Sequence, residues 1–321
     1  MKMRNFRTGE GLKEGRGKAF TLIELLVATA VLAVLVVLFL QILSMATTST
    51  RLSNRAVDAA SQARLAFDRM GRDLENLVKD HDADFSANDA GTGPVDSLVF
   101  LSRTISAGIA NLENRGVSLI AYRVDAAPEY GGRPCLQRAG RAISWSDTGF
   151  LGTSTNGLAQ TFPSALLPAT ADFDLLAQGV IRMVVGLQLY PDNEPVELAD
   201  NTTLANARGQ IVYSVPLRVV EAADGSSSVK VVDLNRVSAL VVGFVTIDLD
   251  TLKLLDATQT KSLAAAFPAP LINETPVDAW ATLVSDPGAL PAALPLPARQ
   301  GVRTFQRFFP ITPNGSRPDE G

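Results

Sequence analysis

One uninterrupted apolar stretch near the N-terminus constrains this chain more than any other feature. It lies within residues 17–43, and between Leu25 and Leu40 it holds no charged residue and a single polar one, Thr29. Those residues alone are slightly short for a bilayer core. The flanking residues extend the run from Phe20 to Met45, which exceeds the roughly 20 residues that a transmembrane helix needs. The sequence therefore predicts a membrane-spanning helix over residues 20–45.

Glu24, near the start of this stretch, needs an explanation. An acidic side chain inside an inserted helix costs roughly 2.5–3.5 kcal/mol on insertion scales, so it is rare without a role. One interpretation places Glu24 at the headgroup boundary, as the last residue of the polar flank. The other interpretation gives the carboxylate a function, and it depends on the residues around it.

The ten residues Lys18–Val27, KAFTLIELLV, resemble the type III signal of type IV pilins and pseudopilins. The resemblance implies that a prepilin peptidase cuts between Ala19 and Phe20 and that Phe20 is then N-methylated. It also makes Glu24 the fifth residue of the mature chain, the position of the family's assembly glutamate. The sequence departs from the family at Ala19, where glycine is usual, and this departure bears on the efficiency of cleavage.

The physical chemistry of this segment agrees with that resemblance. Phe20 and Glu24 are four residues apart, so about one helical turn separates them. In a filament, Glu24 of one subunit could lie beside the new α-amino group of a neighbour shifted along the axis. Opposite charges attract strongly in a low-dielectric environment. The expected partners are therefore a prepilin peptidase, other pilin or pseudopilin subunits and an inner-membrane assembly platform.

The basic leader, residues 1–19, sets the expected orientation. It holds six lysines and arginines against two glutamates, a net charge of +4, so residues 20–321 carry −8 of the whole-chain −4. The positive-inside rule then predicts a cytoplasmic N-terminus at a bacterial inner membrane and a periplasmic location for everything after Met45. An acidic outer domain has no general attraction to nucleic acid, so no nucleic-acid partner is expected.

Helical periodicity continues beyond the membrane run, over residues 46–80. Apolar residues recur at steps of three and four, and charged residues fill the other faces. A helix of about 60 residues is expected, its second half packed on a globular domain. Residues 44–50 are its weakest section because they are poor helix formers, and Gly71 is a second local cost. The predicted apolar stripe is Leu52, Ala56, Ala60, Ala63, Phe67, Met70, Leu74 and Leu77, and the predicted charged faces include Asp68 and Asp73.

An acidic loop is expected to follow the helix. Asp80, Asp82 and Asp84 alternate there with other residues, which is the spacing of ligands in a calcium loop. The rest of that pattern is missing, because Ser86 stands near where the loop glycine would fall and no glutamate completes the set. A solvated connection between helix and strand is the main interpretation, and a calcium site is the alternative.

Beyond this loop the pattern turns to β, which makes the expected fold α+β. Residues 81–311 are predicted to form an antiparallel β-rich domain, and residues 312–321 a polar tail. Pro216 indicates an edge or a bulge in its strand, and the second and third strands are expected to pair across Gly131 and Gly132. The predicted strands are 97–103, 117–125, 134–141, 179–190, 211–221, 237–249 and 301–311, with a short helix over 278–284.

Two further resemblances concern this domain. Residues 176–180, LAQGV, with the alternating residues after them, are similar to minor pilins of the W type and minor pseudopilins of the J type. The whole layout runs from the leader through the TLIELLV helix and the β domain to the late segment RTFQRFFPI. It resembles the Verru_Chthon cassette protein C family of pilin-like proteins.

Little in the sequence points to catalysis. His81 is the only histidine, so a Ser-His-Asp or Cys-His site would have to use it. No set of cysteines and histidines could hold zinc, and no glycine-rich phosphate loop is present, so no cofactor is expected. A glycosidase-type pair of carboxylates stays open. Cys135, the single cysteine, is expected to be a small core residue, with an intermolecular bridge as the alternative.

The expected function is therefore that of a non-catalytic pilin or pseudopilin subunit, and a minor one by its size and its J- and W-like features. The main alternative is a bitopic inner-membrane protein with an external β-rich binding domain, which would keep residues 1–19 and never leave the membrane. Two weaker alternatives are a secreted enzyme on a filament-type tether and an ordinary secretory signal cut near residues 28–30.

Overall fold

The computed structural model describes residues 21–79, 85–88, 96–103, 117–127, 131–143, 167–189, 196–197, 203–204, 209–213, 218–223, 226–231, 234 and 237–311. The chain divides into two compact units between Asn54 and Arg55. The described part of the first unit is helical. The second unit combines the rest of the same helix with antiparallel sheets and short helices. The expected α+β class is confirmed.

Helix α1 (Leu22–Glu75) has 54 residues, a length of about 81 Å at 1.5 Å per residue. It ends five residues before the expected end at Asp80. The reason is that Leu77 and Val78 pair with strand β2 (Asp96–Ser102), Val78 through a backbone hydrogen bond of 2.9 Å. The strand satisfies backbone groups that a further helical turn would otherwise have paired.

The part of α1 in the second unit buries one face, which differs in two ways from the expected pattern. Ala60 is exposed and its neighbour Ala59 is buried instead. Asp73, expected on a solvated charged face, has no exposed surface because it pairs with an arginine of the first sheet at 2.6 Å. Gly71 allows close packing, since a Cβ there would lie 3.4 Å from the ring of Phe309. The buried apolar residues are Ala59, Ala63, Ala66, Phe67, Met70 and Leu74.

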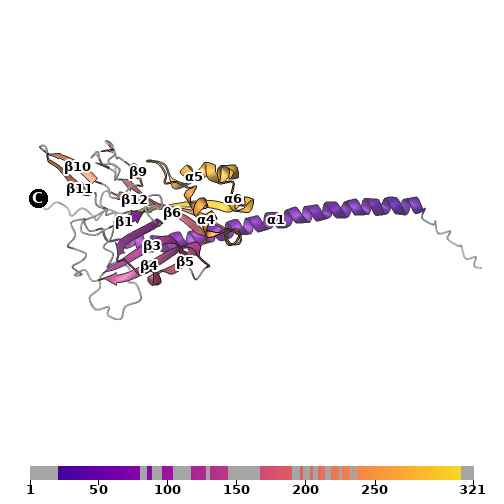
Figure 1. The fold of residues 1–321 in the computed structure, drawn as a ribbon, viewed down its shortest axis with the longest axis horizontal. Coiled ribbons are helices and arrows are strands. Elements are labelled where there is room, and N and C mark those ends of the chain that lie inside the picture. Colours follow the sequence, from indigo (N-terminus) through magenta and orange to yellow (C-terminus); the bar gives the residue numbers. More distant parts are fainter. Residues whose placement is uncertain are drawn as a thin grey trace, which may run out of the picture. The chain divides into compact units, whose positions relative to one another are not determined.

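The first sheet is a five-stranded antiparallel meander in the order β1-β2-β3-β4-β5 (Figure 1). Strands β3 and β4 form the expected hairpin across Gly131 and Gly132, whose φ angles of 72° and 70° favour glycine in the turn. The strand predictions for this part of the chain are confirmed to within two residues at each end. The remaining strands are β1 (Phe85–Asn88), β3 (Val117–Ala127), β4 (Arg133–Ile143) and β5 (Asp174–Gln178).

The second sheet has the order β13-β12-β6-β9, and a third, of short strands, has the order β11-β10-β7-β8. The single strand predicted over 211–221 is wrong, because it divides into β9 (Ile211–Val212) and β10 (Arg218–Ala223), which belong to different sheets. Pro216 lies between them in sequence and has no N–H for a ladder. The other strands are β6 (Val180–Leu189), β7 (Val196–Glu197), β8 (Thr203–Leu204), β11 (Ser226–Val231), β12 (Val237–Ile247) and β13 (Val302–Pro310).

Gly179 connects the two large sheets, since it joins the end of β5 directly to the start of β6. Its φ is 74°, a conformation that residues with a Cβ rarely adopt. The Ile247 N–H, at the end of β12, donates a hydrogen bond of 2.8 Å to the carbonyl oxygen of Gly179. A single glycine therefore turns the chain from one sheet into the other.

One hydrophobic core joins the second half of α1 to both large sheets, and a second core lies between the opposite face of the second sheet and the C-terminal helices. Trp280 and Phe267 fill the second core edge to face, with ring centroids 5.9 Å apart. The helix expected over 278–284 is confirmed and is slightly longer. The helices are η2 (Thr170–Asp172), α3 (Leu249–Leu252), α4 (Ala257–Ala265), α5 (Pro276–Ser285), η4 (Pro287–Ala289) and α6 (Leu296–Gly301).

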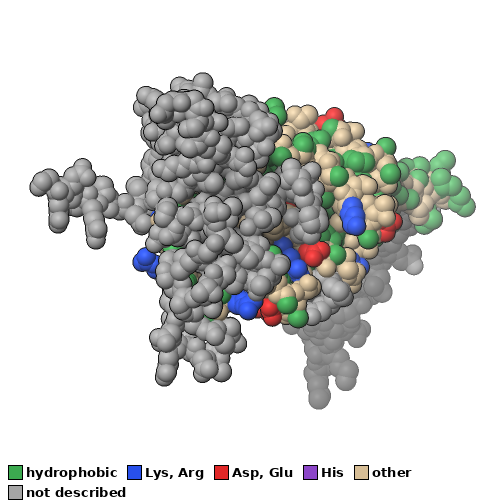
Figure 2. Space-filling view, turned by 60° about the vertical axis from the view of Figure 1, so that its left-hand side comes forward, with side chains coloured by type: hydrophobic (Ala, Val, Ile, Leu, Met, Phe, Trp, Pro, Cys, Tyr) green, Lys and Arg blue, Asp and Glu red, His purple; other side chains and the backbone are tan. Residues whose placement is uncertain are grey.

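The burial of Cys135 agrees with the sequence analysis, because it is 1% exposed, as expected of a core residue. The neighbouring aromatic residues of β13 differ from each other, since Phe309 is buried and Phe308 is 40% exposed. On the described part of the surface in Figure 2, charged side chains of both signs are interspersed among polar and hydrophobic ones.

Candidate functional site at the start of the long helix

Thr21 and Glu24 form a capping box at the N-terminus of α1. The Glu24 amide donates a 3.3 Å hydrogen bond to the Thr21 hydroxyl, and the Thr21 amide donates one of 3.0 Å to Oε2 of Glu24. The Thr21 hydroxyl donates to the same Oε2 at 3.0 Å. These bonds satisfy amides that have no partner within the helix. The Thr-x-x-Glu spacing signals such a cap, and the sequence reasoning did not use it.

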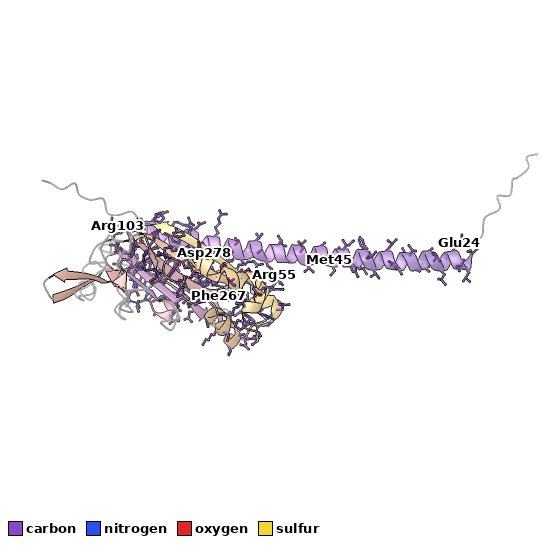
Figure 3. The ribbon with its side chains drawn as sticks, turned by 90° about the horizontal axis from the view of Figure 1, so that it is seen from above. Glu24, Met45, Arg55, Arg103, Phe267 and Asp278 are labelled. Atoms are coloured by element: carbon purple, nitrogen blue, oxygen red, sulfur yellow. The ribbon has the colours of Figure 1, made fainter. Side chains whose placement is uncertain are left out.

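Hydrogen bonds fix the Glu24 carboxylate, but they use only one of its two oxygens as an acceptor. Both hydrogen bonds that it accepts go to Oε2, and Oε1 accepts none from the residues that the structure describes. The side chain lies at the exposed N-terminal end of α1, where the amides of the first helical turn favour negative charge (Figure 3). One oxygen of a fixed carboxylate is thus available to a donor from outside the helix.

From Leu25 to Leu40, α1 presents an exposed surface that is apolar except for Thr29. Its most apolar 18-residue window has a mean hydropathy of 2.9, and none of that window is buried. By length and composition, α1 is the one helix in the described part of the chain that could cross a membrane. The polar Thr29 does not interrupt this surface, because its hydroxyl donates a hydrogen bond of 2.9 Å to the carbonyl of Leu26.

Residues 44–50, here called the polar belt, follow the apolar segment, and they are the section whose sequence predicts a weak helix. The structure keeps it helical, and the hydroxyls of its three threonines are bonded within the helix. Thr47 and Thr48 both donate to the carbonyl of Ser44, and Thr50 donates to that of Ala46, each at 2.9 Å. Such bonds satisfy the hydroxyls without water. The belt therefore carries a smaller desolvation cost than its composition suggests.

Several of the predicted site residues lie outside the described residues. Ala19 and Phe20, the expected cleavage pair, precede the first described residue. The calcium candidates Asp80, Asp82 and Asp84 fall between α1 and β1, in a stretch that is not described either. Within the described ranges, no three His, Cys, Asp or Glu side chains are grouped so that they could hold a metal ion.

Comparison with known proteins bears directly on this segment. Residues 16–40 match the family model of the prokaryotic N-terminal methylation motif. This match supports a type IV pilin-like N-terminus. The match includes Ala19, Phe20 and Glu24, and it ends within the apolar part of α1. Neither curated proteins nor solved structures gave a match to the chain.

The methylation motif and the exposed apolar part of α1 support the same interpretation. A pilin-like N-terminus implies processing by a prepilin peptidase, methylation of the new N-terminus and assembly with other pilins. An exposed apolar helix directly after the processing site fits anchoring in the inner membrane. The capping box places Glu24, the one carboxylate within residues 20–45, in the first turn of α1, next to that site.

Proposed function

We propose that this protein is a minor pilin or pseudopilin subunit, cut between Ala19 and Phe20, N-methylated on Phe20 and built into a type IV pilus or a type II secretion-like pseudopilus. The observation that carries the proposal is the methylation motif at residues 16–40, which runs straight into an exposed apolar helix whose first turn holds Glu24. The role is structural, and no catalysis is assigned to the chain.

Cleavage at this bond leaves the capping box intact. The Thr21 N–H that donates to Glu24 belongs to the peptide bond between Phe20 and Thr21, which the peptidase does not cut. The reaction creates a charged α-amino group one residue before the N-cap. Oε1 of Glu24 is then the acceptor for the amine of a neighbouring subunit. In the membrane or the filament interior an unpaired carboxylate is costly, so this pairing draws each subunit into register.

Before assembly, the apolar part of α1 holds the subunit in the bilayer, with the basic leader in the cytoplasm and the β-rich domain in the periplasm. The size of that domain, and its resemblance to J-type pseudopilins and W-type pilins, favour a minor subunit. The resemblance to the Verru_Chthon cassette protein C family belongs to the same proposal.

The first test is processing. The chain is expressed with and without a prepilin peptidase, and its intact mass and N-terminal sequence are determined. The proposal expects a chain that begins at methylated Phe20 only when the peptidase is present. Ala19→Gly should be processed faster, and Ala19→Trp should be blocked because the protease accepts a small residue there. A chain that keeps Met1 in the presence of the peptidase contradicts the proposal.

The second test is assembly, and it uses two matched carboxylates of α1. Glu24→Gln keeps the size and the cap but removes the charge, so incorporation into filaments should fall sharply while processing continues. Glu75→Gln makes the same change at the exposed C-terminal end of the helix and should assemble normally. Normal incorporation of both variants would contradict the assembly role of Glu24. Absence of the wild-type chain from filaments would support the alternative, a bitopic protein that stays in the membrane with an external binding domain.

A further inference from the structure

Strand β13 leaves one long edge of the second sheet open. It pairs with β12 along its full length of nine residues without a shift of register, and no strand pairs with its other side in the described part of the chain. The other edge strands of the described sheets are shorter, since β11 has six residues, β5 five, β1 four, and β8 and β9 two each. Proteins usually shorten or cover such edges, because unpaired main-chain groups attract other strands.

The opposite edge of the same sheet is closed. The amide of Ile211, in β9, donates to the side chain of Asn273 at 3.1 Å, and the amide of Asn273 donates to the carbonyl of Ile211 at 2.9 Å. Asn273 makes these contacts with a φ of 65°, which is uncommon for a residue with a Cβ. The chain therefore closes the short edge with a turn and leaves the nine-residue edge without one.

The main-chain groups of β13 alternate between β12 and the outside of the sheet. The Ile311 amide, directly after the strand, donates to the carbonyl of Ser238 at 2.8 Å. In an antiparallel ladder every second residue then faces β12, so the amides of Thr304, Gln306 and Phe308 point outward. These three amides have no hydrogen-bond partner among the residues that the structure describes.

The outward groups are accessible. None of residues 303–308 is buried, whereas the paired strand β12 is buried throughout from Ala239 to Ile247. Phe308 is 40% exposed and offers an apolar surface at this edge. Pro310 occupies the same outward set of positions, which are the ones where a strand tolerates proline because no ladder bond is lost.

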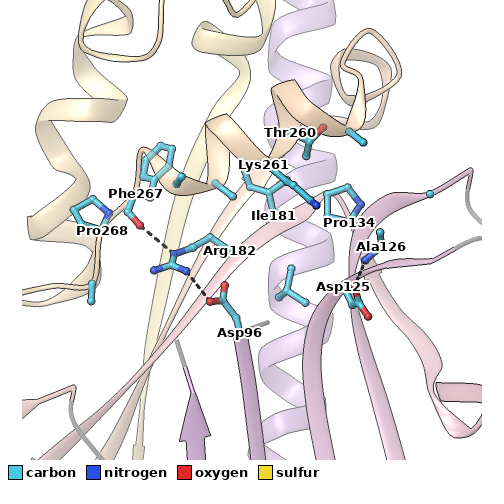
Figure 4. A pocket seen from close by; sticks show the side chains of 16 residues that line it. Asp96, Asp125, Ala126, Pro134, Ile181, Arg182, Thr260, Lys261, Phe267 and Pro268 are labelled. Carbon is cyan, nitrogen blue, oxygen red and sulfur yellow. Dashed lines mark hydrogen bonds and ion pairs between the residues drawn. The ribbon is translucent and has the colours of Figure 1, made fainter. Parts of the chain in front are cut away.

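The second sheet is fixed from its other side. A cleft of about 620 Å³ lies between helix α4 and the hairpin of β3 and β4, and at its floor Arg182 of β6 donates to Asp96 at 2.7 Å and to the carbonyl of Phe267 at 3.0 Å (Figure 4). The side chains of Arg182 and Asp96 are 5% and 3% exposed. Two carboxylates and two basic side chains line the described part of this cleft, so its charges balance and no ligand is assigned to it. A sheet held in this way offers a pre-organised edge, which lowers the entropic cost of binding.

The direction of β13 argues against a second copy as the partner. The strand begins beside the end of β12, where Asp248 lies 3.5 Å from Arg55, and it ends near Phe309, whose ring centroid is 6.2 Å from that of Phe67. Strand β13 and the part of α1 after Arg55 therefore run in the same direction. Two copies paired antiparallel through β13 would hold these helices in opposite directions, although each helix continues from a membrane segment.

We propose that the free edge of β13 accepts an extended strand of a different pilin-like subunit, which adds to the second sheet antiparallel to β13. The main chain of that strand is what the edge recognises, because Thr304, Gln306 and Phe308 offer donors and acceptors at a spacing of two residues, as an extended polypeptide does. An apolar residue of the added strand lies opposite Phe308. The choice of partner rests on the proposed function, since a subunit whose helix packs beside α1 reaches the side of the domain where β13 lies.

Hydrogen exchange of the full chain in lipid nanodiscs tests whether the edge is open. The outward amides of Thr304, Gln306 and Phe308 should exchange at least about tenfold faster than those of Phe305 and Arg307, which pair with β12. Electron-transfer fragmentation resolves the single amides. Equal protection of the two sets would mean that the edge is already covered and would overturn the proposal.

A defined peptide tests strand addition directly. The probe is a fluorescent octapeptide of alternating valine and threonine with N-methylated valine amides, which leaves it one bonding edge and prevents self-association. The control has the same side chains and a methyl group on every amide. Only the probe should bind, with a Kd of at most about 1 mM. Binding of neither peptide, or equal binding of both, would contradict recognition of the main chain.

Proline variants locate the site. Thr304→Pro removes an outward N–H and none that pairs with β12, so the fold should be kept while binding of the probe falls at least about tenfold. Thr304→Val retains the N–H and should bind like the wild-type chain. Phe308→Pro, with Phe308→Leu as its control, replaces this pair if Thr304→Pro does not fold. Binding that survives both proline variants would place the peptide elsewhere.

Photo-crosslinking in cells that assemble the filament identifies the partner. A benzophenone amino acid in place of Phe308 should join this chain to an extended segment of another protein with an N-terminal methylation motif. A link to a second copy, a link to a protein without the motif, or no link despite incorporation into filaments would overturn the proposal. If the chain is absent from filaments, the assembly role fails instead, and the exchange and peptide measurements still decide whether the edge accepts a strand.

Discussion

The hydroxyl of Tyr122 donates a hydrogen bond of 2.5 Å to Oδ2 of Asp73, although neither side chain has any exposed surface. Arg138 donates to both oxygens of the same carboxylate, at 2.6 Å from Nε and 3.1 Å from Nη2. A carboxylate of α1 is thus bound by two neighbouring strands of the first sheet. Charge-assisted hydrogen bonds of this kind strongly fix the orientation of the groups that they join, because a buried charge without its partners is very unfavourable.

The first prediction compares this buried pair with an exposed one on the same helix. Asp73→Ala should reduce the free energy of unfolding by about 3–5 kcal/mol, because Arg138, which is only 14% exposed, loses its carboxylate partner and the buried Tyr122 hydroxyl loses its acceptor. Asp68 forms an ion pair of 2.6 Å with Arg307, and both side chains are about half exposed. Asp68→Ala breaks this pair and should reduce the free energy of unfolding by at most about 1 kcal/mol. Urea unfolding of the two variants in nanodiscs measures both. Equal losses would contradict the importance of burial here.

The second prediction concerns alkaline pH. Burial, followed by the nearby charge of Asp73, raises the pKa of Tyr122 well above its ordinary value of 10. The folded state therefore holds the phenolic proton more tightly than the unfolded state does. This stabilisation is complete below pH 10 and is lost as the pH rises above it, so the free energy of unfolding should fall between pH 10 and pH 11.

Two tyrosine variants test the source of that pH dependence. Tyr122→Phe should be less stable at neutral pH, since a hydrogen bond to a charged group contributes about 1.5–3 kcal/mol, but its stability should change less with alkaline pH. Burial also raises the pKa of Tyr213, so Tyr213→Phe should remove part of the slope as well. If both variants keep the full slope of the wild-type chain above pH 10, other groups are responsible.

The third prediction concerns Gly179, which turns the chain between the sheets. Gly179 and Gly209 both have positive φ, 74° and 67°, so alanine at either position costs about 1–2 kcal/mol in backbone strain. Only at Gly179 would the new Cβ also overlap a backbone atom, the carbonyl oxygen of Ile247. Gly179→Ala should therefore lose roughly 1–3 kcal/mol more than Gly209→Ala in thermal or urea unfolding. A smaller loss at Gly179 would contradict the close approach.

The sequence predicted the features that a local pattern encodes. Apolar runs rich in β-branched residues gave β3 and β12 their positions, and the period of three and four gave α1 its buried face. It did not predict the burial of Asp73, because the arginine that neutralises it lies 65 residues away in another element. A local sequence pattern contains no information about a partner so distant in the chain.

The sequence failed to predict some helices and strands for the same reason, because they too depend on contacts between distant parts of the chain. The division of 211–221 into two strands depends on which sheet each piece joins, and that is a property of the assembled fold. Helix α4 lies in a stretch rich in alanine, and its only clear local signal is the pairing of Asp256 with Gln259. The cleft beside α4 could not be predicted, since its walls come from parts of the chain more than a hundred residues apart.

The fourth prediction concerns Cys135, whose thiol is buried between strands. Its Sγ lies 3.7 Å from the carbonyl oxygen of Asp125, and Nε2 of Gln137 donates to it at 3.5 Å. Burial raises the pKa of the Cys135 thiol, so it is less ionised at pH 8 than an exposed cysteine, and reagents reach it poorly. Iodoacetamide should therefore modify the native chain far more slowly than the same chain in urea, and native chains should stay unlinked in mild oxidant on non-reducing gels. Rapid labelling of the folded chain, or a disulfide-linked dimer, would instead support the intermolecular bridge that the single cysteine leaves open.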